Sequence, residues 1–312
     1  MHPHGITVEV SRRDFVKRST AGIAAVALGG LTAFDGLAEQ KRTPVVVFSK
    51  LYQELNLGYE DAAALTAAAG LDGVDCPVRP KGEVVPERVE EELPRYAAAL
   101  REQGLSMPLL TTSITGPATA YAEKLLRTAK RVGVRYYRLG WEMHAKEIPL
   151  ARQIRELRAQ LKELAAMNKE IGLGAIYQNH SAGSRKYLGG DLNELEEIVS
   201  GFEPEQVGVA FDMGHALVVH GDQWRAHFEK LRSHVRIVYV KDVKRAGQWV
   251  PLGEGDIYQT GFFGKLREIG YAAPVSLHVE HDWNQGQPKR REVMLQTLQR
   301  DTQRLRRWLA AA

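Results

Sequence analysis

Five short polar clusters each follow an apolar run of the kind that forms a β-strand. The clusters span Trp141–His144, Gln178–His180, Asp212–His215, Lys241–Asp242 and His278–Asp282. Carboxylates, imidazoles and a lysine in such places could abstract a proton, bind a divalent metal or hold a polar ligand. Because the C-terminal ends of successive parallel strands meet at one face of a barrel, we expect the clusters to share a pocket. The sequence therefore predicts an enzyme.

Asp212, His215 and Glu280 are the strongest catalytic candidates. With Gly214 turning the backbone, Asp212 and His215 could face one cavity and bind a metal or form an acid–base pair. The alternative is that Asp212 caps the next helix and His215 packs in a loop. Glu280 shares a strand face with His278, and a carboxylate inside a barrel mouth is costly unless it is paired, metal-bound or catalytic. A salt bridge to a neighbouring loop is its alternative.

The other clusters offer groups for proton transfer and sugar binding. Trp141 could form an apolar wall for a sugar ring. Glu142 could be a base or a ligand, or only a surface ion pair. Gln178 and His180 suit hydrogen bonds to hydroxyls, although the same groups often stabilise loops.

Lys241 could act as a cation, an acid or a Schiff-base nucleophile. Its alternative is a permanent ion pair with Asp212 or Glu280. Glu254 belongs to a tight loop, 251–256, that could fold over a ligand. Weaker candidates end the first three strands: Lys50, Tyr52, Asp75, Arg79, Thr111 and Thr112.

The elements that must position these residues alternate along the chain. Eight runs read as strands: Pro44–Ser49, Gly73–Val78, Met107–Ser113, Arg135–Gly140, Gly172–Tyr177, Val207–Phe211, Arg236–Val240 and Pro274–Val279. Segments with helical periodicity separate them, and glycines such as Gly70, Gly104, Gly133, Gly172 and Gly270 are placed to end helices. This alternation predicts an α/β fold, a (β/α)₈ barrel. An open doubly wound sheet would normally carry phosphate-binding glycines after the first strand. None are present there, so we expect no nucleotide cofactor.

Composition and charge fit one globular domain over residues 39–312. The formal net charge is only +4, and the signs alternate along the expected helices, so no nucleic-acid partner is indicated. The lone cysteine, Cys76, cannot form an internal disulfide and is expected to be a small buried side chain. The sequence leaves a homo-oligomer open.

Residues 1–38 read as a twin-arginine signal peptide. Ser11–Lys17 contains the paired arginines, a Gly- and Ala-rich run follows over Ala21–Phe34, and Ala38 suits a cleavage site. The alternative, an uncleaved anchor, is disfavoured because the run is shorter than the ~20 apolar residues of a membrane span. We therefore expect a periplasmic or otherwise exported protein with no stable span after signal removal, and one that meets free sugars rather than sugar phosphates.

Taken together, the clusters resemble the xylose isomerase-like TIM-barrel superfamily of sugar isomerases and epimerases. The resemblance covers about residues 44–285 and rests on Gly70–Asp75, Tyr177–Ser181, Phe211–His215, Tyr239–Asp242, Gly253–Gly255 and Pro274–Glu280. It implies a small carbohydrate ligand. It also implies a divalent metal held by Glu, Asp, His and Glu after strands five to eight, with the two glutamates exchanging the substrate proton.

This chain departs from that ligand set at two positions. Asp212 and Glu280 match, and His215 matches a substrate-contacting histidine, but Gln178 and Lys241 stand where Glu and His are expected. One interpretation is that the Lys241 ammonium occupies the metal's place between Asp212 and Glu280. The other is a rebuilt site for Mn, Mg, Co or Zn made of Glu142, Asp212, His215 and Glu280.

The predicted reaction is proton abstraction next to a carbonyl of a free sugar, keto-sugar or glycoside. Glu280 is the expected base, Lys241 or a cation the stabiliser of the enolate, and His215 and Glu142 the groups that return the proton. Trp141, Gln178, His180, His278 and Glu254 are expected to hold the sugar. A keto-glycoside lyase or hydratase, and a sugar-binding pseudoenzyme that has lost turnover, are the alternatives.

Overall fold

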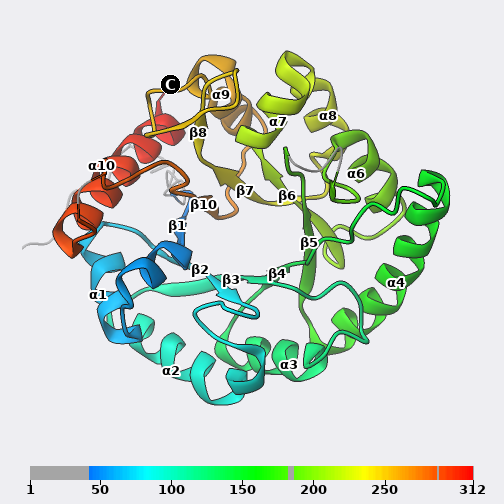
Figure 1. The fold of residues 1–312 in the computed structure, drawn as a ribbon, viewed down its shortest axis with the longest axis horizontal. Coiled ribbons are helices and arrows are strands. Elements are labelled where there is room, and N and C mark those ends of the chain that lie inside the picture. The colour runs from blue at the N-terminus through cyan, green and yellow to red at the C-terminus, as the bar shows by residue number, and fades with distance from the viewer. Residues whose placement is uncertain (1–41, 182–185, 287, 312) are drawn as a thin grey trace, which may run out of the picture. The chain divides into compact units, whose positions relative to one another are not determined.

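A closed barrel of parallel strands forms the centre of the protein. The computed structural model describes residues 42–181, 186–286 and 288–311, so the predicted signal peptide lies outside the described residues. Among them, eight strands close the barrel in the order β1-β10-β7-β6-β5-β4-β3-β2 (Figure 1). Their bounds are β1 Val45–Phe48, β2 Gly73–Val78, β3 Ser106–Thr112, β4 Tyr136–Arg138, β5 Gly174–Gln178, β6 Val207–Asp212, β7 Val235–Val240 and β10 Val275–Leu277. The predicted (β/α)₈ barrel is confirmed.

The strands are apolar on both faces because both faces are buried. Their outward side chains pack against the surrounding helices, and Cys76, on β2, is fully buried as expected. A separate apolar cluster fills the barrel interior, formed by Leu109, Ile176, Ala210, Ile237 and Tyr239. Alternation along each strand therefore brings its last inward residue to the C-terminal rim of the barrel.

Helices form the outer ring (Figure 1). They are α1 Tyr59–Ala68, α2 Val89–Glu102, α3 Ala122–Val132, α4 Leu150–Ile171, α6 Leu192–Val199, α7 Met213–His220, α8 Trp224–Leu231, α9 Phe262–Glu268 and α10 Arg291–Ala310. The five glycines expected to end helices all have left-handed φ angles. Helix α10 packs beside α1, so the last helix closes the ring.

Two elements near the rim were not predicted. Helix α7 begins directly after Asp212, where the sequence suggested a turn at Gly214. Gly214 instead lies in the first turn of α7, and a Cβ there would stand 3.0 Å from the Lys241 carbonyl oxygen and from the Trp249 ring. Glycine is needed at this position for space. The second element is an antiparallel pair, β8 Asp242–Val243 with β9 Trp249–Val250, which follows β7.

Among the described residues, no helix is both long enough and apolar enough to span a membrane.

Candidate active site

A small cavity opens among the C-terminal ends of the strands. Its volume is about 220 Å³, below the ~300–1,000 Å³ of pockets for drug-sized ligands. It is lined by Phe48, Lys50, Arg79, Thr111, Arg138, Trp141, Gln178, His180, Lys241, His278 and Glu280. Residues from seven of the barrel strands and the loops that follow them thus share one space. A larger hollow, of about 740 Å³, lies outside the barrel around α4 and the loop before β6 and has no histidine or cysteine among its lining residues.

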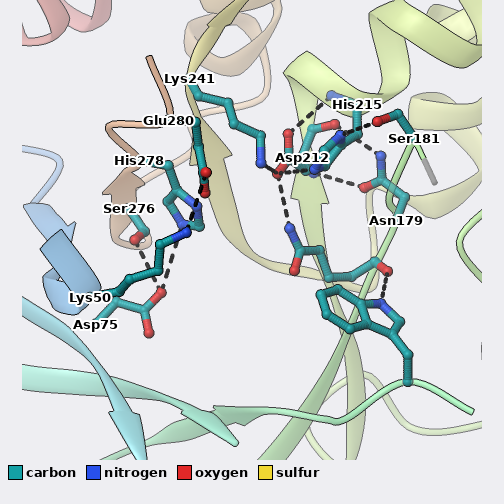
Figure 2. Close-up of polar contacts among 12 residues, drawn as sticks. Lys50, Asp75, Asn179, Ser181, Asp212, His215, Lys241, Ser276, His278 and Glu280 are labelled. Carbon is teal, nitrogen blue, oxygen red and sulfur yellow. Dashed lines mark hydrogen bonds and ion pairs between the residues drawn. The ribbon is translucent and has the colours of Figure 1, made fainter. Parts of the chain in front are cut away.

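Asp212 is the polar centre of one side of this region (Figure 2). The carboxylate is fully buried and every oxygen is used: Oδ1 accepts from the His215 backbone N–H at 3.1 Å, which caps α7. Oδ2 accepts from Gln178 Nε2 at 2.9 Å and lies 3.1 Å from Lys241 Nζ. Asn179 fixes the backbone at the same point, since its side chain both accepts from Asp212 N and donates to Asp212 O.

Lys241 is held as a buried cation. Its side chain is 5% exposed, its ammonium is paired with Asp212, and the Trp249 ring of β9 lies beneath that ammonium, with 5.0 Å between Nζ and the ring centroid. The ion pair and the cation–π contact both compensate for the loss of hydration. The sequence analysis offered Asp212 or Glu280 as the ion-pair partner of Lys241. The structure contains the pair with Asp212.

Glu280 lies on the other side of the cavity, next to β1. Its Oε2 stands 3.4 Å from Lys50 Nζ, and the side chain is 28% exposed, which leaves the carboxylate open to the cavity (Figure 2). Glu280 is also the one carboxylate among the lining residues of this described cavity. It therefore keeps free lone pairs with which to accept a proton.

Asp75 and His278 form the floor beside Glu280. Asp75 is fully buried and accepts hydrogen bonds from Thr111 Oγ1 at 2.8 Å and Ser276 Oγ at 3.1 Å. Burial raises the pKa of Asp75 to about 6, although these hydroxyl groups act in the opposite direction. The His278 ring packs between Phe48 and Tyr239, and its Nε2, 3.9 Å from Asp75 Oδ2, has no hydrogen-bond partner among the described residues.

The histidines of the site are neutral at physiological pH. Burial, reinforced by the nearby Lys241 charge, lowers the pKa of His180 to about 4 and moves the pKa of His215 and His278 well below the ordinary range. His180 lines the cavity and packs on His215, with 3.9 Å between the ring centroids. His215 lies one layer back, where Nδ1 contacts Ser181 Oγ at 2.9 Å and Nε2 stands 3.7 Å from Asp212 Oδ2.

Four predicted site residues do not line the cavity: Asp212 and His215, which lie behind it, and Glu142 and Glu254. Trp141 lines the cavity and donates from Nε1 to the Gln178 carbonyl at 3.3 Å, whereas the next residue, Glu142, is not among the lining residues. Glu254 is exposed. The loop that carries it is held down by Asp242, whose carboxylate accepts from the backbone N–H groups of Gly253 and Gly255.

Sequence reasoning missed several residues of the site. Arg138 is 3% exposed, lines the cavity and lies over the Trp141 ring at 4.1 Å, yet it was read as part of an apolar run. A charged residue inside a barrel strand was the available signal. Trp249 was missed because its hairpin was not predicted. Lys50, Arg79, Asp75 and Thr111 were ranked below the five clusters, although all except Asp75 line the cavity and Asp75 lies directly beneath it.

The closed parallel barrel with a polar cavity at its C-terminal rim defines a TIM-barrel protein of the kind that carries enzyme active sites. The chain belongs to the xylose isomerase-like TIM-barrel family, whose model matches residues 63–309.

Solved structures support the same fold at low sequence identity. D-psicose 3-epimerase from Clostridium cellulolyticum H10, solved with D-tagatose, is 13% identical with a TM-score of 0.65, covering 86% of this chain and 99% of that one. The probable 3-DHS dehydratase AsbF of Bacillus anthracis is 13% identical with a TM-score of 0.58, covering 82% and 97%. The IOLI protein with a bound zinc atom is 16% identical with a TM-score of 0.67, covering 86% and 100%. No curated protein matches in sequence. The structural neighbours thus include a sugar epimerase and a dehydratase.

The residues present do not fit a resident divalent metal. Both oxygens of Asp212 already accept from donors, and one of these is an ammonium that would repel a second cation. Gln178 directs its amide nitrogen, not an oxygen ligand, at Asp212. Within the described ranges no three His, Cys, Asp or Glu residues are grouped to hold a metal. The rebuilt ligand set of Glu142, Asp212, His215 and Glu280 is therefore not assembled.

The Asp212–Lys241 pair gives a stability prediction. Lys241→Met leaves a buried, uncompensated carboxylate, and we expect it to lower the free energy of unfolding by about 3–5 kcal/mol. Asp212→Asn should cost a similar amount because it strands the ammonium. The double variant should lose clearly less than the sum of the two, which urea unfolding of all four proteins measures. Additive losses would show that the two groups do not stabilise each other.

The raised pKa of Asp75 gives a pH prediction. Because its folded-state pKa of about 6 exceeds the ordinary value of 3.8, the folded protein keeps a proton that the unfolded chain releases. Stability should therefore fall as pH rises from about 4 to about 6, by up to about 3 kcal/mol from this group. Asp75→Asn should flatten this part of the profile in denaturant titrations at each pH. An unchanged slope in the variant would assign the dependence to other groups.

Proposed function

We propose that the chain is a sugar isomerase that abstracts a proton next to a carbonyl, with Glu280 as the base and Lys241 as the cation that stabilises the enolate. The observation that carries this proposal is that one accessible carboxylate and one buried ammonium line the same small cavity. The shared fold with a sugar epimerase adds support at the level of fold.

In the proposed step, Glu280 takes the proton from the carbon beside the carbonyl. The electrons of the C–H bond move to the carbonyl oxygen, and the preorganised Lys241 ammonium stabilises the charge that develops there. Lys50 Nζ lies 3.4 Å from Glu280 Oε2 and places a positive charge beside this carboxylate. The hydroxyl proton on the carbon that Glu280 deprotonated then passes to the enolate oxygen. Glu280 returns its own proton to the former carbonyl carbon while the second oxygen becomes the new carbonyl, which interconverts an aldose and a ketose.

A one-base reaction suits this cavity better than a two-base epimerisation. Epimerisation by proton exchange needs a second acid–base group on the opposite face of the substrate. Gln178 cannot titrate, and Glu142 does not line the cavity. His180 has a pKa of about 4 and is a neutral imidazole at pH 7. These features favour transfer between adjacent carbons by Glu280 alone.

Lys241 also bears on the cofactor. We infer that its ammonium supplies the positive charge that a divalent metal would otherwise provide, because it occupies the available oxygen of Asp212. The sequence interpretation placed Lys241 between Asp212 and Glu280. Among the described residues Lys241 pairs with Asp212 and forms no ion pair with Glu280, which pairs with Lys50 instead. Sugar hydroxyls would then contact Trp141, Gln178, His180 and His278.

A lyase is the second candidate function. The same enolate could expel a substituent from the next carbon. The likeness in fold to a probable dehydratase supports this elimination as the second candidate. Both reactions begin with proton loss to Glu280. A sugar-binding protein without turnover would show neither proton loss nor elimination.

The proposal is tested by exchange of solvent deuterium into sugars. We expect the protein to exchange deuterium into at least one ketose or aldose of a broad panel, as measured by nuclear magnetic resonance. The rate of exchange should fall at least about 100-fold in Glu280→Gln. Exchange should persist after dialysis against EDTA, since Lys241 supplies the charge. Glu102→Gln, an exposed change at the end of α2, is the matched control and should retain full exchange. Sugar binding without exchange across the panel would instead indicate the non-catalytic binder.

Export through the twin-arginine route is a separate proposal, carried by the paired Arg12 and Arg13. In a bacterial host with this route, the protein should be recovered from the periplasm with Glu39 as its first residue. Arg12→Lys with Arg13→Lys should hold it in the cytoplasm with its N-terminus uncut. N-terminal sequencing of the two fractions decides between these outcomes. Cytoplasmic recovery of the unchanged protein would refute export.

A further inference from the structure

The cavity carries far more positive than negative charge. Four cationic side chains line it, Lys50, Arg79, Arg138 and Lys241, against the single carboxylate of Glu280. Three of the four have partners within the protein. Lys241 pairs with Asp212, Lys50 with Glu280, and Arg138 donates to the Leu139 carbonyl at 2.6 Å and packs on Trp141.

Arg79 is the exception. It follows β2, is half-buried, and its guanidinium lies over the Phe48 ring at 5.8 Å from the centroid. In the described part of the chain this side chain forms no hydrogen bond and no ion pair within 4 Å. Asp75 and Glu280 are near enough to act on it electrostatically, but neither reaches it. All five N–H donors of a guanidinium are thus left for a ligand.

We propose that Arg79, assisted by Lys50, binds a carboxylate of the substrate, so that the substrate of this enzyme is a sugar acid. The planar fork of a guanidinium matches a carboxylate through two parallel hydrogen bonds. Phe48 supports the guanidinium from one face and leaves its edge for the ligand. The inference rests on the proposed function, since the same ligand would present its carbonyl to Lys241 and Glu280.

The anionic group is a carboxylate rather than a phosphate. TIM barrels commonly bind phosphate through backbone N–H groups of the loops after the seventh and eighth strands. In this chain the amides of the loop after β7 are already occupied, because Asp242 accepts from Gly253 N at 2.7 Å, Gly255 N at 3.1 Å and Ile257 N at 3.3 Å. The cations available to an anion come instead from side chains after β1 and β2.

Charge balance gives the same answer. A neutral sugar would leave the half-buried Arg79 guanidinium without a hydrogen-bonded counter-ion in a cavity of about 220 Å³, since Asp75 and Glu280 act on it only through space. An anionic ligand supplies the missing counter-charge. The cost of burying Arg79 unpaired therefore discriminates against neutral sugars.

The test is calorimetric titration with matched pairs: glucuronate against glucose, galacturonate against galactose, and glucose 6-phosphate as the phosphate probe. We expect at least one acid to bind while its neutral parent does not. Arg79→Met should weaken binding of the acid about 10- to 100-fold, as expected for the loss of two charge-assisted hydrogen bonds. Arg79→Lys should recover part of that loss. Arg101→Met, an exposed change in the last turn of α2, should leave affinity unaltered, and melting temperatures establish that each variant is folded.

Several outcomes overturn the inference. They are equal affinity for acids and neutral parents, acid binding that survives Arg79→Met, selective binding of the phosphate probe, and no binding by any acid. The result separates cleanly from the proposed function. Glu280-dependent exchange into neutral sugars alone would sustain the isomerase and refute the sugar acid. Acid binding through Arg79 with no deuterium exchange would support the carboxylate site and refute the isomerase.

Discussion

The buried ion pair between Asp212 and Lys241 is the interaction on which the rest of the site depends. Moving two charges out of water costs more than their attraction returns unless the remaining lone pairs and protons are also satisfied. Here they are satisfied by the α7 cap, the Gln178 amide and the Trp249 ring. The ion pair thereby holds three elements in place: the start of α7 through the cap, the end of β5 through Gln178, and the β8–β9 hairpin through Trp249.

This arrangement determines which chemistry is available. A cation that is already fixed in the protein stabilises a developing oxyanion without any reorganisation of the surrounding groups. Electrostatic catalysis is most effective under this condition. The same cation saturates the carboxylate that a metal would need. One base, Glu280, then remains accessible to a ligand in this described cavity. Replacing two ligand positions of a family pattern thus changes the number of proton-transfer groups, and through it the class of reaction that the cavity favours.

The sequence predicted the barrel and much of the site, because strand ends follow from periodicity and their polar residues are visible in the chain. Trp141, Gln178, His180, Lys241, His278 and Glu280 do line one cavity. Glu142 failed because the alternation ends with β4: Arg138 and Trp141, an odd number of residues apart, both line the cavity, and Glu142 does not. Glu254 failed because its loop is ordered by Asp242, a long-range hydrogen-bond acceptor that no local pattern reveals. Gly214 served space rather than a turn, since α7 begins at once after its cap.

The division of charge between lysine, arginine and histidine explains how the site stays polarised. Three imidazoles lie in or beside the cavity, yet burial and the Lys241 charge keep all of them neutral. The positive charge instead resides on Lys50, Arg79, Arg138 and Lys241. Even Arg138, whose pKa burial lowers to about 10, remains a cation at neutral pH. A histidine cation would be lost within the physiological range, whereas lysine and arginine side chains as a class ordinarily titrate above it. The field on which the proposed anion binding and enolate stabilisation depend therefore comes from lysine and arginine side chains of the barrel rim.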